Sequence, residues 1–187
     1  MKAAILLIVF NRPDTALQVL NSIRRARPAR IYIAADGPRE TMVGEKELCE
    51  DTRRIVLNAI DWQCEVRTLF QPKNMGCARG VVAAITWFFE NEEWGIILED
   101  DCCPLPSFYQ FCDDMLIRYR DDDRIGLITG NNFQNGRHRG NGSYYFSGVA
   151  NIWGWATWRR VWKNYRLDCK TAFDRAKVVT AALERWK

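Results

Sequence analysis

The sequence alternates short apolar segments with longer amphipathic ones, and this alternation restricts the folds that the chain can adopt. Each apolar segment has the length and composition of a strand, and after each one apolar residues recur at helical spacing. The predicted strands are Ala3–Phe10, Arg30–Ala35, Cys64–Phe70 and Gly95–Leu98. Strands that alternate with helices predict a mostly parallel sheet joined by right-handed crossovers. We therefore expect an α/β protein with helices on both faces of the sheet.

The alternation is less regular in the last third of the sequence. We expect a fifth strand at Ile125–Thr129, a polar loop at Gly130–Gly142 and a strand-like segment at Tyr144–Val149. Four aromatic residues then fall on one side of a predicted helix: Trp155, Trp158, Trp162 and Tyr165. This spacing favours a core role for Trp158 and Trp162. No linker or repeat divides the chain, so we expect a single domain over residues 1–187 with a three-layer, Rossmann-like architecture.

Composition and charge exclude several classes of protein. Hydrophobic residues make up 48% and charged residues 27% of the chain, which is the ordinary globular mixture and excludes disorder and coiled coil. Lys and Arg number 27 against 23 Asp and Glu, an excess of 4 that is too small for a dedicated nucleic-acid binder.

Cysteine usage and the N-terminal segment indicate a compartment. Seven cysteines, two of them adjacent at Cys102 and Cys103, fit neither a disulfide framework nor a structural zinc site, and a reducing compartment is expected. The apolar run Ala3–Phe10 is too short to span a bilayer, and no small-residue cleavage site follows it. We expect a cytoplasmic protein without a membrane span.

Common catalytic motifs are absent, because the sequence contains no phosphate-binding glycine loop, no dinucleotide fingerprint, no H-E-x-x-H and no G-x-S-x-G. A histidine-activated nucleophile would depend on His138, the single histidine, which lies in the polar loop and is better interpreted as a surface residue. Arg137 and Arg139 flank it and are interpreted as exposed loop charges.

An acidic triplet, Glu99-Asp100-Asp101, directly follows the fourth strand. Carboxylates held this close repel one another, and burial raises their pKa unless a cation compensates. Mg²⁺ or Mn²⁺ would suit these oxygen ligands, and Mg²⁺ commonly combines one or two carboxylates with substrate phosphates. The alternative is a solvated acidic turn in which Asp101 caps the next helix, and the triplet alone does not decide between the two.

Several segments together resemble the GT-A glycosyltransferases, and most closely those of the N-acetylglucosaminyltransferase I type. Ile96–Asp101, followed by Pro104–Tyr109, resembles the E-D-D version of the family's D-x-D motif. The other matching segments follow in the family's order: Val9–Pro13, Ile33–Gly37, Gln71–Gly76 and Gly154-Trp155. The resemblance extends from about residue 4 to about residue 165.

This resemblance implies transfer of a sugar from a nucleoside-diphosphate donor, by default a UDP-sugar, to the hydroxyl of a glycan or other acceptor, with inversion. Asp101 would be the direct ligand of Mn²⁺ or Mg²⁺, Arg12 would lie against the diphosphate, and Asp36 would contact the base. The remaining substrate-binding residues implied are Asn11, Asn74, Arg79, Glu99, Asp100, Trp153, Gly154 and Trp155. Among these, Glu99 and Asp100 would hold the sugar or the ribose.

The catalytic base has no clear candidate. An inverting enzyme needs a carboxylate near the acceptor hydroxyl, and in the resembling family this base lies in an Asp-rich stretch after the Gly-Trp segment. Asp168 and Asp174 lie in that direction but do not match the family pattern. We expect a donor-binding part at about 1–130 and an incomplete acceptor part at about 131–187, in a sequence that is cut short.

Two other classes remain open. A non-catalytic module that binds a nucleotide-sugar or a partner protein would need no base. A sugar-phosphate nucleotidyltransferase would share the sheet and the metal, but it usually carries a Gly-rich basic loop after the first strand, and Asn11-Arg12-Pro13-Asp14 is not such a loop.

Overall fold

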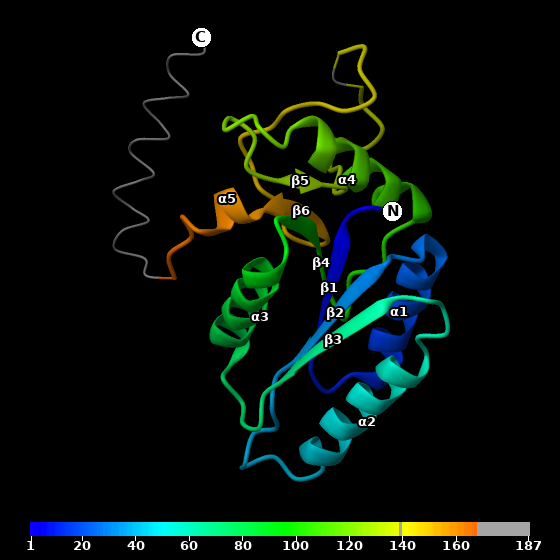
Figure 1. The fold of residues 1–187 in the computed structure, drawn as a ribbon, viewed down its shortest axis with the longest axis vertical. Coiled ribbons are helices and arrows are strands. Elements are labelled where there is room, and N and C mark those ends of the chain that lie inside the picture. Colours follow the sequence, from blue (N-terminus) through cyan, green and yellow to red (C-terminus); the bar gives the residue numbers. More distant parts are fainter. Residues whose placement is uncertain (139, 168–187) are drawn as a thin grey trace.

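A computed structural model describes residues 1–138 and 140–167. Arg139, Asp168 and Asp174 lie outside the described residues. The described part of the chain forms a six-stranded sheet in the order β3-β2-β1-β4-β6-β5 (Figure 1). The strands are β1 (Ala4–Val9), β2 (Arg30–Ala35), β3 (Glu65–Phe70), β4 (Trp94–Glu99), β5 (Ile128–Thr129) and β6 (Trp155–Trp158).

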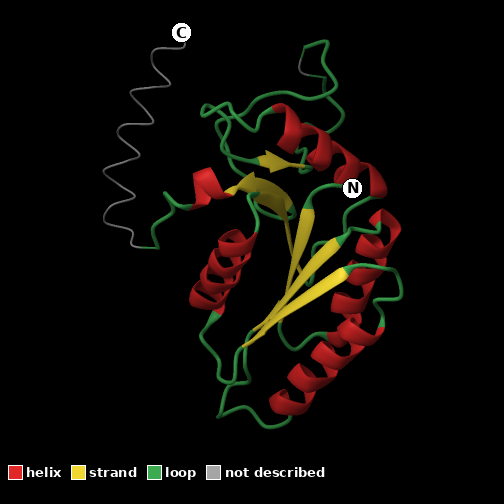
Figure 2. Ribbon diagram, in the orientation of Figure 1, coloured by secondary structure: helices red, strands yellow, loops and turns green. Residues whose placement is uncertain are grey.

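The first four strands are parallel, as predicted, whereas β6 runs antiparallel to β4 and β5 antiparallel to β6. The helices are α1 (Pro13–Ala26), α2 (Glu45–Asn58), α3 (Cys77–Asn91), α4 (Pro106–Arg118) and the short α5 (Arg159–Trp162). Figure 2 shows helices on both sides of the strands. The α/β, three-layer, Rossmann-like architecture is confirmed.

Residues alternate between two cores because successive side chains of a strand point to opposite faces. Ile5 and Leu7 of β1 pack in one core with α1, α2 and α4, whereas Leu6 packs in the other core against α3. In Figure 1, α1 and α2 accordingly lie on the side of the sheet opposite to α3. The predicted inward positions of α1, Ala16, Leu20 and Ile23, are all fully buried.

The C-terminal predictions need three corrections. Tyr144–Val149 is a loop, and β5 covers only two residues of the strand predicted at Ile125–Thr129. The helix predicted around Trp155 and Trp158 is wrong, because these residues belong to β6 and pair with the edge of β4. Pairing with a distant strand overrides local helical spacing. Trp158 is nonetheless a core residue, as predicted, and Trp162 is half-buried against the α3 side of the sheet.

The order of the strands determines where a ligand can bind. From β1 the chain passes through α1 to β2 on one side, whereas β4, which follows α3, lies on the other side of β1. The chain therefore reverses its direction of winding between β1 and β4. In open α/β sheets, ligands bind in the crevice outside the carboxyl ends of the strands at this reversal.

Two further observations concern the cysteines and the helices. The six cysteines of the described residues are all free thiols. Across residues 1–138 and 140–167, no helix has both the length and the apolar composition needed to cross a bilayer.

Candidate functional site

Arg12, at the end of the β1–α1 connection, meets the acidic triplet at the reversal point. Its Nη2 donates hydrogen bonds to Asp100 Oδ1 and, over 3.1 Å, to Asp101 Oδ2. Asp100 is buried and also accepts from the Phe10 backbone N–H at 3.3 Å, whereas the side chains of Arg12 and Asp101 are each about half exposed, at 51% and 54%. The structure thus brings together three of the predicted site residues.

The triplet divides its carboxylates between the two faces of the β4 end. Glu99 projects to the α3 side, because Leu98 before it packs in the opposite core. Burial raises the pKa of Glu99, and the charges of Asp101 and Asp100 raise it further. Burial also raises the pKa of Asp100, against the lowering effect of Arg12. Within the described residues, no hydrogen bond reaches the Glu99 carboxylate, so this group is available to a ligand.

A pocket of about 480 Å³ opens at the carboxyl ends of β1, β2 and β3, and we call it the nucleotide pocket. Asp36, at its wall, accepts hydrogen bonds from the Gly37 backbone N–H at 2.9 Å and from the Met75 N–H at 2.9 and 3.2 Å. Asn74 donates to the Gly37 carbonyl at 2.9 Å and accepts from the Gly76 N–H at 3.1 Å. Asp36 and Asn74 therefore hold two loops together beside the pocket.

Glycines permit this close approach of backbone and side chains. A Cβ on Gly37 would lie 2.5 Å from the backbone of Lys73, which leaves no space for a side chain. A Cβ on Gly80, in α3, would lie 3.3 Å from Asp36 Oδ2. Gly76 begins α3 at a φ of +80°, a conformation that L side chains rarely adopt.

Asn11 and Arg79 are among the predicted residues that do not line the nucleotide pocket. Asn11 turns away and donates to Glu45 Oε1 at 3.0 Å, where it supports the 37–44 loop. Arg79 is exposed on α3 and does not line the nucleotide pocket.

Arg39 lines the nucleotide pocket, although no motif or spacing in the sequence points to it. Its guanidinium pairs with Glu45, its backbone N–H donates to Glu45 at 2.7 Å, and its Cζ lies 5.8 Å from the centre of the Phe10 ring. The ion pair with Arg39 lowers the pKa of Glu45 to about 2. A pair of residues across a loop turn leaves no periodic pattern in the sequence, so only the closed loop reveals it.

Gly154 separates two tryptophans that face different surroundings. Its φ of +77° turns the backbone, and its missing Cβ would lie 3.4 Å from Leu98 Cδ2. Trp153, before it, is 64% exposed and lines a cavity of about 900 Å³ that we call the polar pocket, together with Asp101. Trp155, after it, is in β6 and packs on the α3 side. Only Trp153 and Gly154 therefore accompany Asp101.

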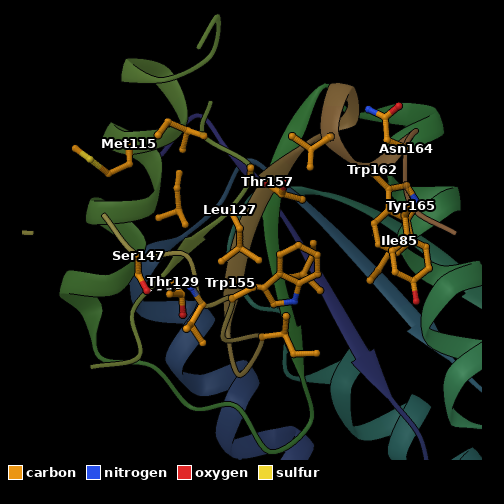
Figure 3. A pocket seen from close by; sticks show the side chains of 18 of the residues that line it. Ile85, Met115, Leu127, Thr129, Ser147, Trp155, Thr157, Trp162, Asn164 and Tyr165 are labelled. Atoms are coloured by element: carbon orange, nitrogen blue, oxygen red, sulfur yellow. Dashed lines mark hydrogen bonds between the residues drawn. The ribbon is translucent and has the colours of Figure 1, made fainter. Parts of the chain in front are cut away.

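Trp155 instead lines an apolar cavity of about 870 Å³ on the α3 side of the sheet. Figure 3 shows its walls, with Ile85, Met115, Leu127 and the stacked rings of Trp162 and Tyr165. Glu99 lines both this cavity and the nucleotide pocket. His138 and Arg137 are exposed and line none of the three cavities.

The donor set fits a metal only in combination with a substrate. Within the described residues, no group of three or more His, Cys, Asp or Glu side chains could hold a metal ion by itself. The exposed carboxylate of Asp101 suits the kind of Mg²⁺ site in which one or two carboxylates, substrate phosphates and water complete the shell.

No family model matches the sequence, and no curated protein matches it either. Among solved structures, the chain is similar to 4-diphosphocytidyl-2C-methyl-D-erythritol synthase from Anaerococcus prevotii DSM 20548, with 10% identity and a TM-score of 0.48, over 85% of this chain and 73% of that one. It is also similar to a UDP-glucose pyrophosphorylase complexed with UDP-glucose, with 12% identity and a TM-score of 0.40, over 68% of this chain and 56% of that one. At these identities and TM-scores the likeness supports no conclusion, and the function has to be argued from the site.

Proposed function

We propose that this protein binds a nucleoside-diphosphate sugar at the carboxyl ends of β1 and β4 and transfers the sugar to an acceptor hydroxyl. The observation that carries the proposal is the meeting of Arg12 with Asp100 and Asp101 at the reversal point, beside the nucleotide pocket. The Arg12 guanidinium, held by two carboxylates next to a pocket of about 480 Å³, suits a ligand that combines phosphates with a flat, uncharged base.

Each residue has a role that its geometry allows. Arg12 is half exposed and offers the diphosphate further N–H groups of its guanidinium. Asp36 Oδ2 accepts only the longer of the two Met75 contacts, so it retains a lone pair for an N–H of a pyrimidine base. Glu99 and Asp100 would accept hydrogen bonds from hydroxyl groups of the sugar or the ribose.

Asp101 would hold Mn²⁺ or Mg²⁺ together with the donor phosphates. When bound, such an ion neutralises the negative charge that develops on the leaving diphosphate. Arg12 contributes a second positive charge at the same place.

The connection after β1 supports sugar transfer over nucleotidyl transfer. It contains three residues, Phe10, Asn11 and Arg12, between the end of β1 at Val9 and the start of α1 at Pro13. No glycine lies in it, and proline at the first helical position removes one N–H group. The connection is therefore not the Gly-rich basic loop that sugar-phosphate nucleotidyltransferases usually carry, and nucleotidyl transfer is our second alternative.

The catalytic base is not assigned. Within the described residues, Asp101 is the only carboxylate that lines the polar pocket. A non-catalytic nucleotide-sugar-binding module is therefore the alternative that an activity measurement must exclude.

Calorimetric titration of UDP, GDP and CDP, with and without Mn²⁺, tests the proposal. We expect a diphosphate to bind more tightly with Mn²⁺, and we expect Asp101→Asn to abolish that dependence. Asp121→Asn is the matched control, because Asp121 is 84% exposed beyond the end of α4. Failure of all three diphosphates to bind would overturn the proposal. Binding without transfer or hydrolysis of any UDP-sugar would leave the non-catalytic module.

A further inference from the structure

We propose that the polar pocket binds a carbohydrate, with the exposed ring of Trp153 as the surface on which a sugar ring stacks. This inference rests on the proposed function and specifies its acceptor as a glycan. It concerns a different cavity from the nucleotide pocket, so the two can fail separately.

The side chains around the polar pocket have the chemistry that a sugar requires. Hydroxyl and amide groups both donate and accept hydrogen bonds, as the hydroxyl groups of a sugar do. Nine of the 20 residues that line the pocket carry such groups: Ser107, Thr129, Asn131, Asn132, Ser143, Tyr144, Tyr145, Ser147 and Asn151. In the apolar cavity the proportion is lower, because 8 of its 32 lining residues carry such groups and most of the others are aliphatic or aromatic. The volume of the polar pocket, about 900 Å³, is within the range of small-molecule sites.

Trp153 is exposed, yet its position is fixed. Its backbone carbonyl accepts a hydrogen bond from Asn131 Nδ2 at 2.8 Å, and the same amide nitrogen lies 2.9 Å from Thr129 Oγ1. Its ring meets that of Phe133 edge to face, with the centres 6.0 Å apart. A large apolar ring held in place at 64% exposure costs hydration free energy in the unbound protein, and the C–H face of a sugar would cover it.

The backbone around Gly154 supports this arrangement. The positive φ at Gly154 lets Trp155 enter β6 while Trp153 remains at the rim of the pocket. Because a Cβ at this position would approach Leu98 and Phe108, the turn is packed against the core.

Asp101 connects the polar pocket to the donor site. Its carboxylate lines this pocket and accepts from Arg12, which lines the nucleotide pocket. A sugar stacked on Trp153 would therefore be adjacent to the place where the donor diphosphate is expected.

The test uses methyl α- and β-glycosides of glucose, galactose, mannose and N-acetylglucosamine, titrated without a nucleotide and followed by saturation-transfer NMR. We expect at least one glycoside to bind, and Trp153→Ala to weaken that binding by about three- to tenfold. Trp153→Phe, which keeps a smaller ring, should recover part of the affinity. Phe146→Ala is the matched control, because Phe146 is 65% exposed but lines the apolar cavity, and it should leave the affinity unchanged.

Two results would overturn the inference: no binding of any of these glycosides to the unmodified protein, or equal affinity in the unmodified protein and Trp153→Ala. Either result together with Asp101-dependent binding of UDP would remove the carbohydrate inference alone. Glycoside binding that depends on Trp153 in a protein that binds no diphosphate would instead sustain carbohydrate recognition and overturn the glycosyltransferase proposal.

Discussion

Arg12 Nη2 donates to both Asp100 and Asp101, and so one nitrogen joins the end of the β1–α1 connection to the end of β4. Neighbouring carboxylates need positive charge, and the acidic triplet together with the family resemblance indicates a divalent cation. The structure supplies one positive charge from the protein itself. A metal at Asp101 would therefore compete or cooperate with Arg12, and the two cases can be measured.

Arg12→Lys tests whether the planar guanidinium matters beyond its charge. Lysine keeps the positive charge but loses the fork of donors that holds two carboxylates and a phosphate together. We expect the affinity for UDP in Mn²⁺ to fall about tenfold, a typical cost for one charge-assisted hydrogen bond. Calorimetry measures this change. Arg24→Lys, in an exposed pair with Asp61, is the control, and an equal loss there would show that the effect is not local.

Glu99→Gln tests the electrostatic cost of the triplet through its pH dependence. The pKa of Glu99 is raised in the folded protein, so the folded state binds a proton more tightly than the unfolded state. Its contribution to the free energy of unfolding is therefore largest below the ordinary pKa of a glutamate and is lost as the pH rises through the raised value. Removing the charge should stabilise the protein at pH 7 but not at pH 4.

Urea denaturation of Glu99→Gln at the two pH values measures this difference, expected at about 1 kcal/mol. Glu93→Gln, at an exposed acid just before β4, serves as the control. A stability gain of the same size at both pH values would mean that packing, and not charge, explains the effect.

Gly37→Ala tests the contact between the two loops at the nucleotide pocket. A Cβ at this position would come within 2.5 Å of the Lys73 backbone, so one loop has to move. We expect the free energy of unfolding to fall by about 1–3 kcal/mol. Gly126→Ala is the matched control, since its Cβ would make only an ordinary contact of 3.8 Å with Val161. Urea denaturation compares the two, and equal stabilities would contradict the crowding.

Local pattern predicted the parallel part of the sheet because each strand there is followed by its own amphipathic helix. It failed at Trp155 and Trp158, where spacing fits a helix but the edge of β4 offers an antiparallel partner. Strand pairing between distant segments is not visible in a local window, so β6 and its antiparallel pairing could not be predicted.

The positions of some candidate site residues followed from the sequence, whereas those of others did not. The rule that ligands gather at the carboxyl ends of parallel strands was enough to place Arg12 beside Asp100 and Asp101. Asn11 and Arg39 were not predictable in this way, because their positions depend on Glu45 and on how the 37–44 loop closes. Sequence position thus indicates which end of the sheet a residue occupies, but not the direction of its side chain.

Arg12→Ala should change the affinity for Mn²⁺ in opposite directions without and with UDP. Without a nucleotide, Arg12 neutralises the carboxylates of Asp100 and Asp101 and should weaken their attraction for a cation. With UDP present, Arg12 should help to hold the phosphates that complete the shell of the metal. We therefore expect Arg12→Ala to bind Mn²⁺ alone more tightly than the unmodified protein, and to bind Mn²⁺ with UDP more weakly.

Electron paramagnetic resonance of free Mn²⁺ measures both affinities in one titration series. Arg24→Ala controls for the loss of one positive charge, because the pair of Arg24 with Asp61 is on the exposed surface. Equal Mn²⁺ affinities in Arg12→Ala and the unmodified protein, without UDP, would mean that Asp101 does not bind the ion. Tighter binding in both conditions would mean that Arg12 only opposes the metal, and its proposed contact with the diphosphate would be wrong.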